Sequence, residues 1–173
     1  MNIFRTLIIG LFVALSGCAT LPDNHIDGNA LPAKSGILVV GLHTDAPVPT
    51  NPLTDLVALF FVGEGDSEYV NRHIVFQGGN YYAVIPLPAR KYHFDLQSYG
   101  KRFWALDKSA GFTIRPDTIT YIGDITSTVI DSYDLGVKDE FANAKNYLRS
   151  KYPKMLTSYS IEKQITPVQF EPR

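Results

Sequence analysis

The sequence predicts a mainly-β fold, an antiparallel β-sandwich of about seven to eight strands with one amphipathic helix near the C-terminus. Short runs rich in Val, Ile, Tyr and Phe recur along the chain between turns that contain Gly, Pro, Asn or Asp. One stretch near the C-terminus changes to the period of a helix. Hydrophobic residues make up 45% of the 173 residues, with ten Tyr and ten Phe, so one domain can form a core without disulfides.

Eight segments have the composition of strands, and a ninth is a further possibility. The first, 37–42, is a continuous apolar run with the length of a strand that is buried on both faces. Segment 91–97 alternates most clearly, and we expect Tyr92, Phe94 and Leu96 to face the core while His93 and Gln97 face solvent. The other segments are 56–62, 70–77, 81–87, 103–106, 111–114, 118–130 and, as the further possibility, 159–165. The glycine turn at 78–80 predicts that 70–77 and 81–87 form a β-hairpin.

A helix is predicted at about 136–152, because apolar residues there recur at intervals of four, three, four and four. This apolar stripe consists of Val137, Phe141, Ala144, Leu148 and Tyr152. Asp134 is the expected N-cap, and Pro153 is expected to end the helix. We expect the stripe to lie on the β-domain.

The first eighteen residues have the pattern of an export signal. Arg5 precedes a nine-residue apolar run at 7–15, which is about half the roughly 20 residues that cross a bilayer as a helix. The run ends in Leu15-Ser16-Gly17-Cys18, which resembles the lipobox of bacterial lipoprotein precursors. The resemblance implies that residues 1–17 are a signal peptide, that Cys18 is the lipidation site, and that the mature chain begins there. The alternatives are an ordinary secretory signal or an uncleaved anchor, and in both of them Cys18 has no role.

Cys18 is the only cysteine of the chain, so it cannot form an internal disulfide, and lipidation would consume its thiol. The resemblance implies two or three acyl chains, such as palmitate, which anchor a protein stably to a membrane. Residues 18–35 have the composition of a flexible linker, and 36–173 would form the domain. Ala19 stands where lipoproteins kept in the inner membrane often have Asp. This analogy favours the outer membrane, facing the periplasm, with the inner membrane as the alternative.

Three further segments carry a second resemblance: 85–94 (IPLPARKYHF), 112–117 (FTIRPD) and 120–125 (TYIGDI). They are similar to a family of bacterial lipoproteins with a small transthyretin-like or carboxypeptidase-regulatory-like sandwich of unknown function. The family pattern often has Gly in place of Arg90 and Pro-Gly in place of Pro116-Asp117. The resemblance implies a fold and no chemistry.

No catalytic, metal-binding or cofactor-binding set is predicted. The formal net charge is −1 and the pI is near 6.4, which argues against a nucleic-acid partner. The sequence has no H-E-x-x-H and no G-x-S-x-G motif. His43 with Asp45 and His93 with Asp95 would form a metal site only if the two pairs converged, and we favour two solvated strand faces.

One segment is a candidate contact for a partner or ligand: Lys101, Arg102, Phe103 and Trp104. Aromatic residues beside Arg are enriched in binding hot spots. The favoured alternative is that Trp104 is a core anchor while Lys101 and Arg102 face water.

These observations favour a non-enzymatic, membrane-anchored envelope lipoprotein that acts as an interaction or assembly module. Its expected partners are the membrane, through the lipid on Cys18, and an envelope protein or glycan. The first alternative is a periplasmic domain that binds a glycan or another small ligand through 101–104. A less favoured alternative is a cell-wall hydrolase whose site has no recognisable motif.

Overall fold

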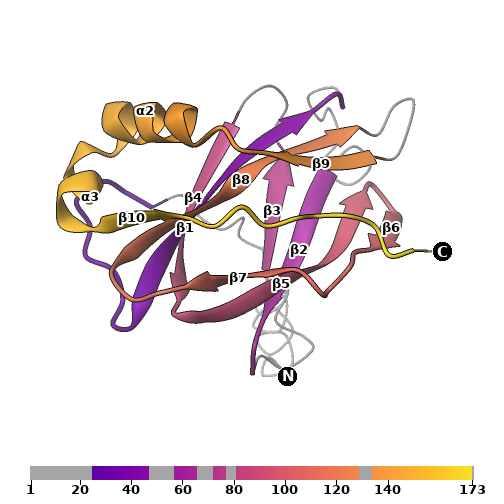
Figure 1. Cartoon of the computed structure of the whole chain (residues 1–173), viewed down its shortest axis with the longest axis horizontal. Helices are drawn as coiled ribbons and strands as arrows, with labels where there is room; N and C mark the ends of the chain where they lie inside the picture. The colour runs from indigo at the N-terminus through magenta and orange to yellow at the C-terminus, as the bar shows by residue number, and fades with distance from the viewer. Residues whose placement is uncertain (1–24, 47–56, 66–71, 77–80, 129–133, 173) are drawn as a thin grey trace, which may run out of the picture.

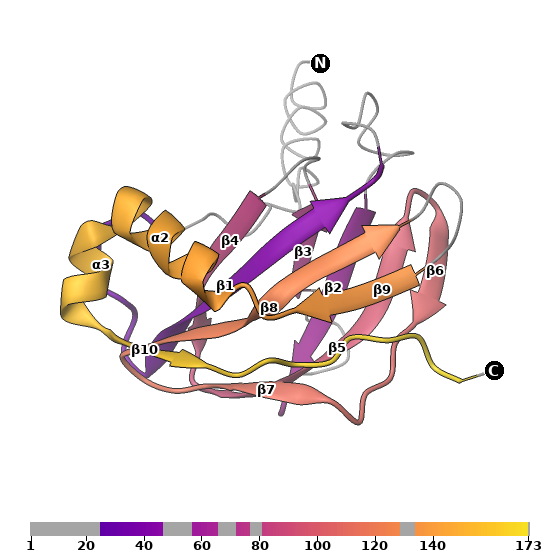
Figure 2. The ribbon, with the colours of Figure 1, turned by 45° about the horizontal axis from the view of Figure 1, so that its top comes forward.

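The fold is a mainly-β sandwich of two five-stranded sheets with a pair of short C-terminal helices, so the predicted fold class is confirmed. A computed structural model describes residues 25–46, 57–65, 72–76, 81–128 and 134–172. Cys18 and the expected signal peptide lie outside these residues. Figures 1 and 2 show the two helices together at one end of the molecule, with the C-terminal strand leading away from them.

Sheet A has the order β10-β8-β1-β4, and β9 also pairs with β8. Its strands are β1 (Ser35–Thr44), β4 (Tyr81–Pro88), β8 (Thr118–Thr128), β9 (Asp134–Lys138) and β10 (Ser160–Lys163). β1 pairs with β4, and β8 with β9, in the expected antiparallel sense. The pairings of β8 with β1 and β10 are parallel, unlike the prediction, because long stretches of chain separate these strands in place of tight turns.

Sheet B has the order β3-β2-β5-β6, and β7 also pairs with β5. Its strands are β2 (Val57–Gly63), β3 (Arg72–Phe76), β5 (Arg90–Tyr99), β6 (Arg102–Ala105) and β7 (Gly111–Ile114), and all their pairings are antiparallel.

The predicted hairpin of 70–77 with 81–87 is wrong. β3 pairs with β2 in sheet B, whereas β4 pairs with β1 in sheet A. Both strands contribute to one core, Ile74 and Phe76 from one sheet and Ala83 and Ile85 from the other. The chain therefore passes from one sheet to the other between β3 and β4, and each strand covers the same core from its own side.

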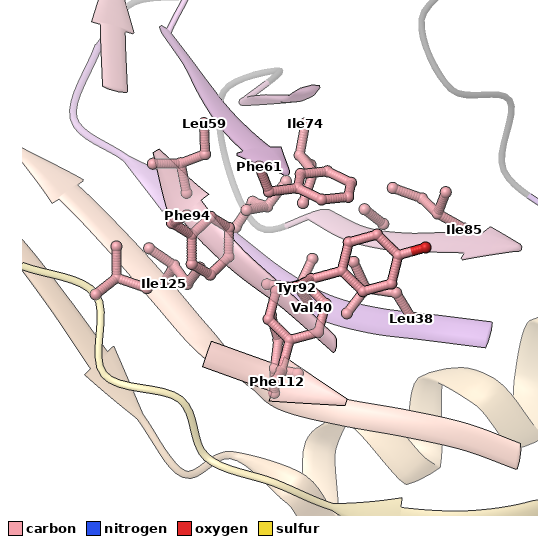
Figure 3. Packing of buried hydrophobic residues seen from close by; sticks show 14 of the residues in the cluster. Leu38, Val40, Leu59, Phe61, Ile74, Ile85, Tyr92, Phe94, Phe112 and Ile125 are labelled. Atoms are coloured by element: carbon pink, nitrogen blue, oxygen red, sulfur yellow. The ribbon is translucent and has the colours of Figure 1, made fainter. Parts of the chain in front are cut away.

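The main core lies between the two sheets and contains a group of closely packed aromatic rings (Figure 3). The Phe61 ring meets those of Tyr92 and Phe94 edge-on, at centroid distances of 5.9 and 6.3 Å. The Tyr92 ring stacks on Phe112 at 5.5 Å. Leu38, Val40 and other aliphatic side chains of sheet A pack against them. Each such ring pair adds about 0.5–1.5 kcal/mol to the stability that comes from burial.

The alternation predicted for 91–97 holds at Tyr92 and Phe94, which are buried, but is wrong at Gln97, which is also buried. The register explains the difference, because Phe61 lies opposite Phe94 while its neighbour Phe60 lies opposite Leu96. Asp95 is thus the extra residue of a β-bulge, and a bulge reverses the faces of the residues that follow it. Gln97 consequently points across the sandwich, where its Nε2 donates to Ser127 Oγ at 2.7 Å.

The predicted single helix at about 136–152 is wrong at its start. Residues 134–138 form β9, where Leu135 is buried and Val137 packs on the core, so Asp134 begins a strand and is not an N-cap. The helical residues are α2 (Phe141–Lys151) and α3 (Pro153–Ser158). Val137 fits the helical spacing of the stripe only by coincidence. Pairing with β8 makes residues 134–138 a strand.

The rest of the stripe behaves as predicted, because α2 and α3 lie on the outer face of sheet A. Ala144 and Leu148 are fully buried there, in a second cluster with Ile37, Val39 and Tyr121 of the sheet. Pro153 follows the end of α2 and begins α3, a position that Pro favours because it needs no amide donor. Of the described helices, none is long and apolar enough to cross a membrane.

Residues 25–34 lie against the domain. The His25 amide donates to the Val84 carbonyl at 2.7 Å. The Asp27 carboxylate accepts the backbone amides of Met155 and Lys154 at 2.9 and 3.3 Å. These contacts tie this segment to β4 and α3, so a free linker stays a prediction only for residues before 25.

Candidate functional site

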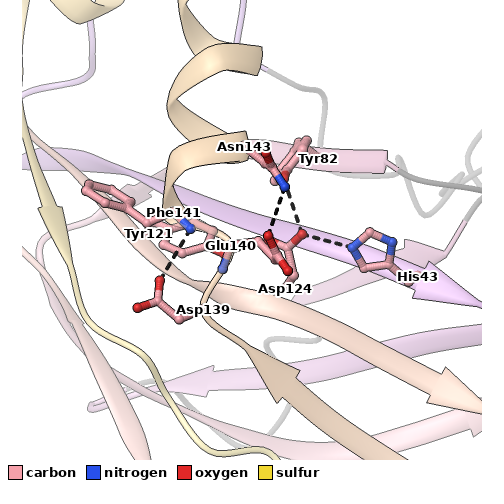
Figure 4. A network of polar contacts seen from close by, with 8 residues as sticks. All are labelled: His43, Tyr82, Tyr121, Asp124, Asp139, Glu140, Phe141 and Asn143. Atoms are coloured by element: carbon pink, nitrogen blue, oxygen red, sulfur yellow. Dashed lines mark hydrogen bonds and ion pairs between the residues drawn. The ribbon is translucent and has the colours of Figure 1, made fainter.

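A cavity of about 550 Å³ opens on the outer face of sheet A beside the start of α2, and we call it the polar cavity. Figure 4 shows part of the network of polar side chains that lines it. Its walls come from four strands and one helix. They consist of His43 from β1, Tyr82 from β4, Asp124 and Thr126 from β8, Lys138 from β9, and Glu140 and Asn143 at the start of α2. The helices cover this face of the sheet at Ile37 and Val39 but leave it open further along β1.

A bulge at Gly123 places the central carboxylate in the polar cavity. In β1 the residues Val39 and Gly41 are two apart, but their partners in β8, Tyr121 and Asp124, are three apart. Gly123 has a φ of +119°, a conformation that L side chains rarely adopt. Residues three apart normally face opposite sides of a strand, and the extra residue brings Tyr121 and Asp124 to the same face.

Gly41 leaves the space that the Asp124 carboxyl group occupies. A Cβ at position 41 would lie only 2.3 Å from Asp124 Cγ. The two glycines thus act together: Gly123 forms the bulge in β8, and Gly41 leaves space on the neighbouring strand β1. The Asp124 side chain can therefore lie over Gly41, and Asp124 is only 3% exposed.

Three side chains donate hydrogen bonds to the buried Asp124 carboxylate. Tyr121 Oη donates to Oδ1 at 2.6 Å, while Tyr82 Oη and His43 Nε2 contact Oδ2 at 3.2 and 2.9 Å. A buried carboxylate is costly unless it is hydrogen-bonded in this way. The three bonds therefore fix the carboxylate and hold the imidazole at the mouth of the cavity.

Both tyrosines stay protonated donors far above neutral pH. Burial raises the pKa of Tyr82, and the negative charges of Asp124 and Glu140 raise it further. Burial also raises the pKa of Tyr121, as does its hydrogen bond to Asp124. Burial is the larger cause in both cases, and the nearby carboxylates add to it.

Tyr121 also connects the sheet to the helix. Its hydroxyl accepts the backbone amide of Glu140 at 3.0 Å, one residue before α2 begins. The Glu140 carboxylate in turn accepts Asn143 Nδ2 at 2.8 Å. The position of the helix start therefore depends on the same network that holds Asp124.

Aromatic rings form one side of this region. The ring of Tyr82 packs on that of Tyr147 at a centroid distance of 4.8 Å, and Tyr147 in turn lies 6.0 Å from Tyr152. Tyr82 and Tyr147 are each half-buried. The polar cavity thus combines carboxylate, amide, imidazole and ammonium groups with the ring of Tyr82, which Tyr147 supports from outside the lining.

The two His–Asp pairs considered from the sequence do not converge. His43 Nε2 contacts Asp124 Oδ2 at 2.9 Å, and Asp95 pairs with Lys108 Nζ at 2.5 Å. His93 lines a separate cavity of about 370 Å³ with Lys91 and Gln164. Within the described ranges, no group of three His, Cys, Asp or Glu residues could hold a metal ion.

The segment 101–104 lies at the edge of sheet B. Lys101 and Arg102 are exposed, and so is Phe103, at 59% of the surface of the residue. The Phe103 ring approaches that of Phe60 at 6.3 Å. Trp104 is half-buried and belongs to neither buried cluster, which differs from the core anchor that the sequence favoured. The segment is therefore an accessible apolar and basic surface.

The polar cavity is not evident from the sequence, although TYIGDI at 120–125 carries part of a resemblance. An isolated Gly inside a β-rich run is a known sign of a bulge, and Gly123 stands beside an acidic residue in such a run. That signal indicates an unusual position for Asp124. It does not indicate that His43 and Tyr82, 81 and 42 residues away, meet it.

Comparisons with protein-family models, with curated proteins and with solved structures find no match for this chain. Its function must therefore be argued from its own residues.

Proposed function

We propose that this protein is a lipid-anchored envelope protein whose β-sandwich acts as a non-enzymatic interaction module. The observation that carries the proposal is Leu15-Ser16-Gly17-Cys18 at the end of a short apolar run, with Cys18 as the only cysteine. Acylation of that thiol would attach the domain to a membrane. Ala19 favours the periplasmic side of the outer membrane, with the inner membrane as the alternative.

Metabolic labelling tests the anchor. Cells that express the full chain are grown with radiolabelled palmitate, and the protein is isolated in wild-type, Cys18→Ser and Ser16→Ala forms. We expect label in the wild type and in Ser16→Ala, which keeps a small residue before the cleavage site, and no label in Cys18→Ser. Equal labelling of Cys18→Ser, or none in the wild type, would refute the anchor. Separation of the two membranes then assigns the location.

The surface around Phe103 supports the interaction role. An exposed Phe beside Lys101 and Arg102 combines apolar area with positive charge, as binding hot spots do. A photo-crosslinking residue at position 103 is expected to capture an envelope protein in cells. The same residue at Arg149, exposed on α2, is the control. Equal capture from both positions, or none from 103, would contradict the assignment of this surface.

The half-buried Trp104 favours a second candidate function, the binding of a glycan or another small ligand at the same surface. Because Trp104 is the only tryptophan, its fluorescence reports on this segment alone. A titration with peptidoglycan fragments should change the emission if the surface binds glycan. An unchanged emission together with successful protein crosslinking would leave the protein partner as the function of this surface.

A further inference from the structure

The polar cavity contains more negative than positive fixed charge. Asp124 is 3% exposed, and its hydrogen-bond partners in the described chain are two neutral hydroxyls and the His43 ring. Buried carboxylates are usually balanced by a cation. Among the described residues no Lys or Arg forms an ion pair with Asp124, so hydrogen bonds stabilise its charge.

The mouth of the cavity adds one charge of each sign. The half-buried Glu140 provides a second carboxylate, which accepts a hydrogen bond from Asn143. Lys138 lies opposite Asp124 in the pairing of β8 with β9, so both side chains are on one face of sheet A, but Lys138 is exposed. The cavity therefore has two carboxylates, a single ammonium group near solvent, and an imidazole.

We propose that the polar cavity binds a small molecule through a protonated amino group of that molecule. The ammonium group lies between the Asp124 and Glu140 carboxylates, where it makes charge-assisted hydrogen bonds. The half-buried Tyr82 ring and its negative surroundings favour a cation at the same place. Lys138 and Thr126, at the outer part of the cavity, bind hydroxyl or carboxylate groups of the remaining molecule.

The geometry favours an amine as the ligand over an anion or a metal ion. An anion alone would face two carboxylates, and the described residues do not bring three metal ligands together. A cavity of about 550 Å³ has the size of a small-molecule site. An amino sugar and an amino acid both fit this description, and both present the same ammonium chemistry.

Calorimetric titration of the full chain in detergent at pH 7 tests the proposal. The probes are glucosamine, alanine and glucose, because glucose and glucosamine differ only in the amino group. We expect glucosamine, alanine or both to bind, and glucose to bind at least about tenfold more weakly than glucosamine where glucosamine binds. Binding of one amine alone assigns the source as an amino sugar or an amino acid.

Two variants locate the binding. Glu140→Gln keeps the shape of the side chain and removes one carboxylate, and it should weaken amine binding at least about tenfold. Glu171→Gln changes an exposed carboxylate outside the cavity and should bind as the wild type does. Thermal unfolding of each variant verifies that the fold is kept.

Three results would overturn the proposal: neither amine binds, glucose binds as tightly as glucosamine, or Glu140→Gln binds with unchanged affinity. The proposal does not depend on the anchor at Cys18. Failure of the titration and failure of palmitate labelling are therefore separate outcomes.

Discussion

Replacing Gly123 by Ala should destabilise the whole domain, because the bulge that builds the polar cavity requires glycine. The φ of +119° is strained for any residue with a Cβ, and such strain costs about 1–3 kcal/mol. The added Cβ would also lie 2.4 Å from Val137 Cγ1, and relieving such overpacking costs about 1–3 kcal/mol. Together the two effects predict a loss of about 2–6 kcal/mol, a large part of the 5–15 kcal/mol that stabilises a typical domain.

Urea unfolding followed by far-UV circular dichroism measures this loss, with Gly136→Ala as the matched control. Gly136 lies in the neighbouring strand β9, and a Cβ there would have no atom within 4 Å. We expect the control to change the free energy of unfolding by no more than about 0.5 kcal/mol. If Gly123→Ala is as stable as Gly136→Ala, the account of the bulge is refuted.

A double variant separates the two causes. Val137→Ala removes the Cγ1 atom that the new Cβ would meet. In this background Gly123→Ala should cost only the backbone strain, about 1–3 kcal/mol. If the cost is the same in both backgrounds, steric contact with Val137 is not a cause of the loss.

Three further predictions concern the helices and pH. Leu148→Ala should lower the free energy of unfolding by about 2–5 kcal/mol because this side chain of α2 is fully buried against sheet A. Arg149 is the exposed neighbour, and Arg149→Ala should change the free energy of urea unfolding by about 0.5 kcal/mol or less. Similar losses in the two variants would contradict the packing of α2. Asp27→Ala should cost about 0.5–2 kcal/mol because two amides at the start of α3 lose their acceptor, and an unchanged unfolding midpoint would disprove this capping contact. Burial raises the pKa of Tyr152 to about 12, against about 10 in the unfolded chain, so its contribution is complete below pH 10 and disappears as pH rises to 12. Unfolding measured from pH 8 to 12 should therefore depend less steeply on pH in Tyr152→Phe, and identical curves would show that Tyr152 does not contribute.

Local patterns in the sequence were sufficient to predict the separate elements. The apolar run at 37–42 and the alternation around Tyr92 and Phe94 indicated β1 and β5, because burial on both faces or on one face leaves a direct mark on composition. The spacing of Ala144 and Leu148 likewise indicated the helical face that packs on sheet A.

Properties that depend on partners distant in sequence were not predictable in this way. The turn at 78–80 has the composition of a hairpin, yet β3 and β4 pair with strands of different sheets. Gln97 is buried because a bulge at Asp95 reverses the faces of β5. Val137 matched the helical period but lies in β9. In each case tertiary pairing overrides a local preference.

The polar cavity shows the same limit. Asp124 comes to Tyr121 through one glycine, but the other groups arrive from β1, β4 and α2. No spacing in the sequence relates His43 or Tyr82 to Asp124, so only the assembled sheet reveals the site.

The central claim is that Cys18 carries the lipid that anchors the domain, and the mass of the mature N-terminus tests it most directly. The protein is extracted from membranes, digested, and its N-terminal peptide is analysed by mass spectrometry. The account predicts a peptide that begins at Cys18 and carries the added mass of a diacylglyceryl group. A peptide that begins after Cys18, or one that contains residues 1–17 and an unmodified thiol, would contradict it.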